Sequence, residues 1–218
     1  MSLRALILLA LLAPIARAGE FPLPQLDLDT WKPLAYDCGL ASEPPLIDGR
    51  LDDAAWDRTQ WTADFVDITG DSALAPRYRT RAKLLWDGQY LYIGAELEEP
   101  HLWATLTERD AVIYHDNDFE VFIDPDGDTH DYYELEINAL GTVWDLLLTA
   151  PYRDGGHAVD NWDIAGLKCA VHLDGTLNDP SDIDRGWSVE LALPWAALTE
   201  CAPQPLSPTG NESWRVNF

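Results

Sequence analysis

The sequence feature that most constrains the fold is a period-two alternation of apolar and polar residues, which recurs in several short runs. In an extended strand successive side chains point to opposite faces, so each run predicts a strand with one apolar face and one polar face. In the run around Ile93, for example, Leu91, Ala95 and Leu97 share the apolar side. The runs cover residues 91–97, 119–123, 133–137, 144–148 and 187–193.

Turn-forming residues separate these runs, and the segments with helical character are short. The turn pairs are Asp87-Gly88, Asp126-Gly127, Leu140-Gly141, Gly155-Gly156, Asp174-Gly175 and Arg185-Gly186. Helical turns are expected at residues 52–57, 106–112 and 195–198. Many short strands between turns predict an all-β fold: an antiparallel β-sandwich, immunoglobulin- or jelly-roll-like, with two packed sheets.

The charge balance excludes two classes of partner. The 218 residues include 14 Lys+Arg and 38 Asp+Glu, a formal net charge of −24. A chain this acidic lacks the cations that neutralise nucleic-acid phosphates or attach a protein to anionic lipid. A hydrophobic content of 47% nevertheless argues against disorder, and the length is sufficient for one domain with a core.

The first residues are typical of a secretory signal peptide. Residues 1–4 are positively charged, residues 5–15 are almost wholly apolar, and Ala16-Arg17-Ala18 forms a cleavage pattern. An uncleaved membrane anchor is the alternative interpretation of residues 1–18. We expect cleavage, no membrane association afterwards, and a periplasmic or extracellular location. Residues 19–45 are rich in proline and predict an arm on the surface of a domain spanning residues 46–218.

Three cysteines follow the signal peptide: Cys38, Cys169 and Cys201. In an oxidising compartment two of them are expected to pair, and the sequence leaves all three pairings open. Their spacing matches no zinc-binding pattern.

Carboxylates gather on two of the predicted strands. Glu120 lies on the polar side of one run, and Glu134, Glu136 and Asn138 lie on the polar side of the next. If the two strands are neighbours, these groups share one sheet face, where close like charges raise one another's pKa. Such a face indicates a cation, a ligand rich in hydroxyl groups, or an outer surface in contact with water.

The loop between these strands is also acidic. Four carboxylates occur within eight residues around a glycine turn: Asp124, Asp126, Asp128 and Asp131. This set predicts a site for a hard cation such as calcium, which takes six to eight oxygen ligands. The alternative is an acidic turn whose aspartates accept hydrogen bonds from backbone N–H groups.

The chain contains ten Trp and eight Tyr residues, which is many for its length. Most are expected in the core, including Trp86, Trp144 and Trp187 on apolar faces. Tyr114, in contrast, lies in a polar loop. An exposed aromatic ring beside carboxylates suits a sugar, because the ring stacks on the pyranose face and the carboxylates accept its hydroxyls.

Four blocks of this sequence resemble carbohydrate-binding module family 9. They are LIDGRLDDAAW at 46–56, KLLWDGQYLYI at 83–93, DFEVFID at 118–124 and GWSVELALPW at 186–195. Their order and spacing are similar to those of the family from residue 46 to residue 218. The resemblance implies a calcium-stabilised β-sandwich that binds sugars, in some members at a reducing end between two aromatic rings.

The resemblance also implies roles for individual residues. Tyr114 falls where the family has its first stacking Trp, Glu120 matches the sugar-binding Glu, and Asn138 matches an Asn. Glu134 and Glu136 fall where the family has Gln and Arg, so this chain lacks the Arg donor. The family's last strands and second stacking Trp have no counterpart before Phe218, and we expect those strands to be missing.

These observations favour a secreted, non-catalytic domain that binds mono- or oligosaccharides or polysaccharide ends through Tyr114, Glu120, Glu134, Glu136 and Asn138. One alternative is glycoside hydrolysis by a carboxylate pair such as Glu134 and Glu136, or association with a glycoside hydrolase partner. A second is a calcium-stabilised sandwich that has lost sugar binding. Haem, held through Met in related DOMON-type sandwiches, is not expected, because the only methionine is Met1.

Overall fold

The computed structural model describes residues 33–69, 74–202 and 208–218. The predicted signal peptide at 1–18 and residues 19–32 of the predicted arm lie outside these described residues. Residues Tyr36–Phe218 form one compact unit, to which the following description is confined. In the part of the chain that is described, no helix has the length and apolar character to cross a membrane.

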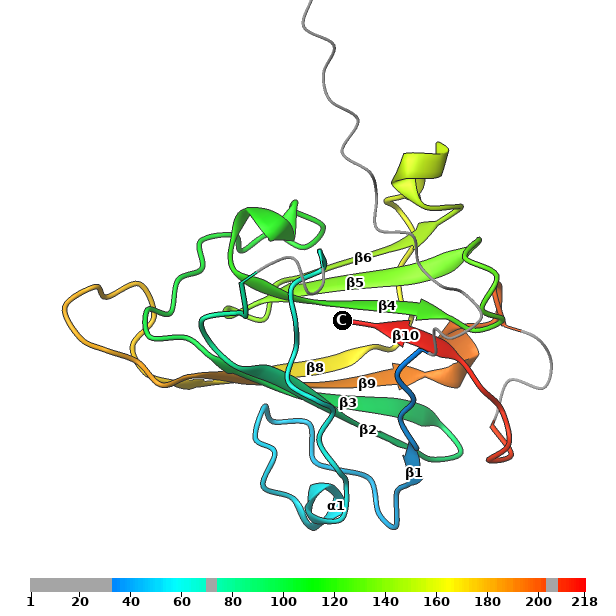
Figure 1. Cartoon of the computed structure of the whole chain (residues 1–218), viewed down its shortest axis with the longest axis horizontal. Coiled ribbons are helices and arrows are strands. Elements are labelled where there is room, and N and C mark those ends of the chain that lie inside the picture. The colour runs from blue at the N-terminus through cyan, green and yellow to red at the C-terminus, as the bar shows by residue number, and fades with distance from the viewer. Residues whose placement is uncertain (1–32, 70–73, 203–207) are drawn as a thin grey trace, which may run out of the picture. The chain divides into compact units, whose positions relative to one another are not determined.

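The unit is a sandwich of two five-stranded sheets, as predicted, and Figure 1 shows them as two layers. The first sheet has the order β1 (Gly39–Leu40), β2 (Thr80–Trp86), β3 (Tyr90–Glu98), β9 (Gly186–Pro194) and β8 (Lys168–Asp174). The second has the order β10 (Arg215–Asn217), β4 (Asp118–Asp124), β5 (Tyr132–Asn138), β6 (Val143–Leu148) and β7 (Ala158–Val159). Neighbouring strands are antiparallel, except that β1 pairs with β2 in parallel. Strand β1 thus brings residues of the predicted arm into the first sheet.

The helical pieces are short: α1 (Ala54–Asp57), η2 (Ile113–His115), η3 (Tyr152–Asp154) and η4 (Trp195–Ala197). The helix predicted at 106–112 is wrong. The Asp116 carboxylate accepts the backbone N–H groups of Thr105 and Leu106, both at 2.8 Å, and this holds the chain in a loop. The helical turn lies later, in η2.

The core lies between the two sheets, where the predicted alternation places apolar side chains. Phe119, Val121 and Ile123 of β4 pack inward beside Leu135 and Ile137 of β5, and all are almost completely buried. Burying such side chains stabilises the fold by about 1.5–3 kcal/mol each. Since inward residues alternate with outward ones, the polar residues of β4 and β5 necessarily project from the outer face of the second sheet.

Strand β6 departs from the prediction. Its register pairs Trp144 with Glu136 and Asp145 with Leu135, so Trp144 lies on the outer face and Asp145 on the inner face. The prediction that Trp144 belongs to the core is therefore wrong. Asp145 is fully buried, and its charge is compensated by an ion pair with Arg109 and an N–H from Ile164. A long-range ion pair thus overrides the apolar pattern.

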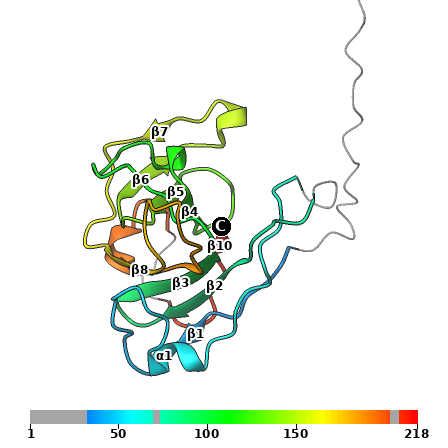
Figure 2. The ribbon, with the colours of Figure 1, turned by 90° about the vertical axis from the view of Figure 1, so that its left-hand side faces the viewer.

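The outer face of the first sheet is covered by residues 46–57, and Figure 2 shows α1 on that side. Glu190 of β9 is fully buried there and accepts three hydrogen bonds from this segment: Asp48 N at 2.9 Å, Gly49 N at 2.8 Å and Trp56 Nε1 at 2.7 Å. Gly49 has φ +88°, and a Cβ on it would lie 2.5 Å from the backbone N of His172. The first sequence block, residues 46–56, therefore covers the outer face of this sheet and is held there by Glu190.

The expected disulfide is absent: Cys38, Cys169 and Cys201 are all free thiols. Cys38 directly precedes β1 and Cys169 lies on β8, and these two strands form opposite edges of the first sheet. With neighbouring strands about 4.8 Å apart, the two cysteines lie well beyond the Cα separation of about 7 Å that limits a disulfide. Cys201 lies next to Tyr133, whose hydroxyl accepts its backbone N–H at 2.9 Å.

Candidate functional site

The pairing of β4 with β5 brings the predicted carboxylates together. The register sets Glu120 opposite Glu136, Asp118 opposite Asn138, and Phe122 opposite Glu134. Directly opposed residues share one face of a sheet, so Asp118, Glu120, Glu134 and Glu136 form one group, here named the carboxylate cluster. The sequence analysis omitted Asp118, although its place two residues before Glu120 assigns it to the same face.

The carboxylate cluster is buried and lacks a protein cation. Glu134 is 6% exposed and Glu136 is 1% exposed, while Asp118 and Glu120 are half-buried. Within the described residues, no ion pair involves any member of the cluster. Asp118 Oδ2 and Glu134 Oε2 are buried without a hydrogen-bond partner. Buried polar atoms are nearly always hydrogen-bonded, so these two oxygens mark an incomplete environment.

Burial and mutual repulsion disfavour the ionised forms of these groups. Burial, followed by the charge of Glu120, raises the pKa of both Asp118 and Glu134 to about 7. Burial, followed by the charges of Asp118 and Glu120, raises the pKa of Glu136 to about 8. Burial alone raises the pKa of Glu120. No ion pair with a described lysine or arginine offsets this repulsion, so the four carboxyl groups keep their protons to a higher pH than isolated side chains do.

Two aromatic side chains border the cluster. The backbone N of Tyr114, in η2, donates to Glu136 Oε2 at 2.9 Å, which fixes the short helical turn over β5. The Tyr114 ring is 58% exposed, and its centroid lies 6.1 Å from that of Trp144 in a tilted contact. Trp144 lies opposite Glu136 in the sheet. An exposed aromatic surface therefore adjoins the carboxylates, as the sequence predicted for Tyr114 alone.

Tyr152 is a third aromatic residue on this side of the second sheet. It begins η3 and is 58% exposed. Burial of its hydroxyl, followed by the charge of Glu134, raises the pKa of Tyr152 to about 12.

Asn138 has a different environment from the glutamates. It is fully buried, and its Nδ2 donates to Leu106 O and to Asp116 Oδ2, both at 2.9 Å. Its Oδ1 accepts from Leu140 N and Thr142 N, at 3.1 and 3.0 Å. An amide has two donor hydrogens and two acceptor lone pairs, so all are engaged. Asn138 therefore holds two loops in place and presents no free polar group to a ligand.

The acidic loop at residues 124–131 brings three of its four predicted ligands together. One carboxylate oxygen from each of Asp124, Asp126 and Asp128 lies within 4.8 Å of the others, and Asp131 lies outside this group. Asp124 accepts from Gly127 N at 2.8 Å and Thr129 N at 2.9 Å. The arrangement therefore combines turn-capping hydrogen bonds with a spacing that is compatible with a cation.

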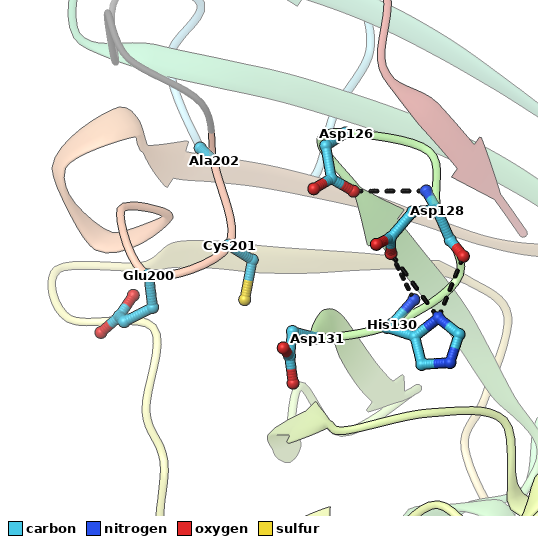
Figure 3. Close-up of a pocket in the computed structure, with 7 residues that line it drawn as sticks. All are labelled: Asp126, Asp128, His130, Asp131, Glu200, Cys201 and Ala202. Carbon is cyan, nitrogen blue, oxygen red and sulfur yellow. Dashed lines mark hydrogen bonds and ion pairs between the residues drawn. The ribbon is translucent and has the colours of Figure 1, made fainter.

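Figure 3 shows the hollow beside the acidic loop. Asp126 accepts from Asp128 N at 3.2 Å, and Asp128 accepts from His130 N at 2.8 Å. The hollow is lined by Asp126, Asp128, His130, Asp131, Glu200, Cys201 and Ala202. Its lining contains no Trp, Tyr or Phe, which distinguishes it from the surface around Tyr114.

A third acidic group has an internal counter-charge. Asp110, Asp145 and Asp163 each offer an oxygen within 4.8 Å of the others, but Arg109 pairs with all three. The sequence analysis missed this network, because the four residues come from three separate segments. The Arg109 guanidinium makes the group a structural ion-pair network.

The family relationship follows from comparison with known proteins. Residues 47–209 match the family described as carbohydrate family 9 binding domain-like. The chain belongs to this family. The resemblance noted from the four sequence blocks is thereby confirmed, and the carbohydrate family 9 domain accounts for most of the sandwich.

Two curated relatives of this domain are large enzymes. The chain is 26% identical over 156 residues to exoglucanase XynX of Acetivibrio thermocellus, covering 71% of this chain and 12% of that protein. It is 24% identical over 155 residues to endo-1,4-beta-xylanase A of Thermoanaerobacterium saccharolyticum, covering 71% of this chain and 11% of that protein. The chain thus spans about one-ninth to one-eighth of the length of these relatives.

Two solved structures resemble the fold. A putative carbohydrate-binding protein from Bacteroides uniformis is 16% identical with a TM-score of 0.56, covering 76% of this chain and 75% of that one. A carbohydrate binding module family 9 from Caldicellulosiruptor kristjanssonii, solved in complex with cellotriose, is 18% identical with a TM-score of 0.47, covering 72% and 66%. At 16% identity the likeness to the Bacteroides uniformis structure concerns the fold alone.

Proposed function

We propose that this carbohydrate family 9 domain binds a saccharide on the outer face of β4, β5 and β6, with no hydrolytic activity of its own. The observation that carries the proposal is Tyr114, whose ring is exposed while its backbone N–H donates to the buried Glu136. An exposed ring beside hydrogen-bond acceptors is the arrangement that suits a pyranose.

The members of the site have separate roles in this proposal. The Tyr114 ring stacks on the apolar face of a sugar, with Trp144 supporting it from the sheet. Glu120, half-buried on β4, accepts hydroxyl hydrogens from the sugar. Glu136 acts as a positioning residue for Tyr114, and Asn138 acts through the loops that it holds.

Binding is favoured over hydrolysis by the burial of the carboxylates. A two-carboxylate mechanism needs both groups at the scissile bond, one as acid and one as base or nucleophile. Glu134 and Glu136 are 6% and 1% exposed, and Glu136 accepts a hydrogen bond from Tyr114 N. Neither is accessible to flank a sugar ring. The relatives named as exoglucanase and xylanase support a module that accompanies a glycoside hydrolase.

The names of those relatives also direct the choice of ligand and location. We propose β-1,4-linked glucan or xylan oligosaccharides, or the ends of such polymers, as the ligand class. The signal-peptide pattern of residues 1–18 supports action in the periplasm or outside the cell. Calcium at Asp124, Asp126 and Asp128 would stabilise the acidic loop, a structural role separate from sugar contact.

The test is a titration of the purified chain with glucose, xylose and cello- and xylo-oligosaccharides, followed by tryptophan fluorescence and calorimetry. Tyr114→Ala removes the ring and should weaken binding about 10- to 100-fold. This corresponds to the loss of about 1.4–2.8 kcal/mol of stacking free energy. Tyr78→Ala, which removes another partly exposed ring away from this site, is the matched control. Absence of binding by the wild type at millimolar saccharide would refute the proposal.

A further inference from the structure

We propose that the carboxylate cluster is a binding site for a divalent cation, with calcium as the fitting ion, coordinated by Asp118, Glu120 and Glu136 beneath the aromatic surface. This site is distinct from the acidic loop at residues 124–131. The cation site stands on the spacing of the cluster's oxygens and on its two buried, unpartnered oxygens. Its further role, ordering the surface that receives a saccharide, rests on the proposed function.

The spacing of the oxygens supports the assignment. One oxygen each from Asp118, Glu120 and Glu136 lies within 4.8 Å of the other two. Oxygens bound to the same calcium ion at about 2.3–2.6 Å are at most about 5 Å apart, so a single ion reaches all three. The oxygens come from two paired strands, β4 and β5, which hold them in place without an ion.

A second observation, independent of this spacing, points to a missing partner. Glu134 lies two residues before Glu136 on the same face and is only 6% exposed. Its Oε2 has no hydrogen-bond partner. Asp118 Oδ2 is likewise buried and unpartnered. On a solvated acidic face, water would hydrogen-bond to these oxygens. In a core without a ligand, donors from the protein would do so. An ion bound by Asp118, Glu120 and Glu136 supplies positive charge to the cluster that contains both unpartnered oxygens.

The charge and depth of the cluster favour a metal ion over an organic cation. None of the described lysines or arginines forms an ion pair with the four carboxylates. Glu136 is 1% exposed, which favours a small ion over a bulky organic cation. A bare divalent cation is small enough to enter and carries two charges, which hard carboxylate oxygens prefer.

The site would connect ion binding to the aromatic surface. Glu136 binds the proposed ion with one oxygen while its Oε2 holds the backbone N of Tyr114 at 2.9 Å. Fixing the Glu136 carboxylate therefore fixes η2 and the exposed ring. Because Trp144 lies opposite Glu136 and its ring contacts that of Tyr114, both rings lie close to the ion.

The experiment uses the full chain after chelator treatment, titrated with calcium by calorimetry and with terbium by luminescence excited through tryptophan. We expect a bound ion whose sensitised emission calcium displaces. The double variant Asp118→Asn with Glu120→Gln should weaken this site at least 10-fold and remove most of the emission. Asp126→Asn with Asp128→Asn, in the acidic loop, is the matched control: it should lose the ion proposed for that loop and keep the ion of the carboxylate cluster, so the two variants remove different binding events. Thermal unfolding of each variant verifies that it folds.

The outcomes separate this proposal from the proposed function. Calcium binding that is unchanged in the Asp118→Asn, Glu120→Gln variant, or no binding by the wild type at millimolar calcium, overturns the cation site. A single variant, Glu134→Gln, should weaken binding to a smaller extent and confirms the location if the double variant is unstable. An ion bound without any saccharide binding sustains the site and refutes the proposed function. Saccharide binding that a chelator does not change refutes the link between the two.

Discussion

Each sheet of this domain has a buried glutamate on its outer face, but the two glutamates differ in their hydrogen bonding. Glu190, on the first sheet, is enclosed by residues 46–57 and accepts three hydrogen bonds from backbone and indole donors. Glu134, on the second sheet, is 6% exposed and keeps one oxygen without a partner. The same residue type, on the outer face of a strand, is thus satisfied in one sheet and unsatisfied in the other.

The difference teaches how a structural carboxylate is distinguished from a functional one. Where the segment that covers a buried carboxylate supplies hydrogen-bond donors, the carboxylate holds that segment against the sheet. Where the covering segment supplies too few donors, the charge remains available to a ligand at a cost in stability. The Arg109 network is an intermediate case, in which a protein cation compensates three aspartates.

The largest effect is expected at Glu190. Glu190→Ala leaves three donors unpaired, two of them buried, and hydrogen bonds to a charged group contribute about 1.5–3 kcal/mol each. We expect the free energy of unfolding to fall by about 4 kcal/mol, measured by urea denaturation. Glu190→Gln retains an acceptor and should lose less. A loss below about 1 kcal/mol for the alanine variant would contradict the structural role.

A smaller loss is expected when the counter-charge of the aspartate network is removed. Arg109→Met leaves Asp145 fully buried, with the Ile164 N–H as a remaining donor. Breaking a buried ion pair costs about 3–5 kcal/mol, and the half-exposed arginine reduces this to about 2–3 kcal/mol. Thermal unfolding in low salt measures the change. Arg153→Met, whose partner Asp154 is exposed, is the control and should change stability by less than about 0.5 kcal/mol.

The smallest effect, and the one opposite in sign, is expected in the carboxylate cluster. Glu134→Gln removes a carboxyl group whose pKa burial raises to about 7, from a cluster that forms no ion pair with a described lysine or arginine, and adds an amide donor toward its neighbours. In calcium-free buffer the free energy of unfolding should stay unchanged or rise by up to about 1 kcal/mol. Denaturant unfolding, run in parallel with Glu190→Gln, provides the comparison. If Glu134→Gln lowers the free energy of unfolding as much as Glu190→Gln does, the proposed difference between the two outer faces is contradicted.

Much of the fold was predictable because the alternation of apolar and polar residues is a local property of a strand. The runs around Ile93, Val121, Leu135 and Val189 all form strands with their apolar sides in the core. The prediction was wrong for Trp144, because the Asp145–Arg109 ion pair joins residues that are distant in sequence. The three cysteines are also free instead of forming the expected disulfide, and for Cys38 and Cys169 the reason is a strand order that places them at opposite edges of the first sheet.

The sequence by itself determined the β-sandwich, the acidity and the residue types on each face of β4 and β5, since these follow from composition and a period of two. Only the tertiary structure decided which carboxylates are satisfied. Glu190 receives donors from a segment about 140 residues away, and Asn138 is fully engaged by loops. Glu134 and Asp118 keep unpaired oxygens, because hydrogen bonding depends on which distant backbone groups arrive at each face.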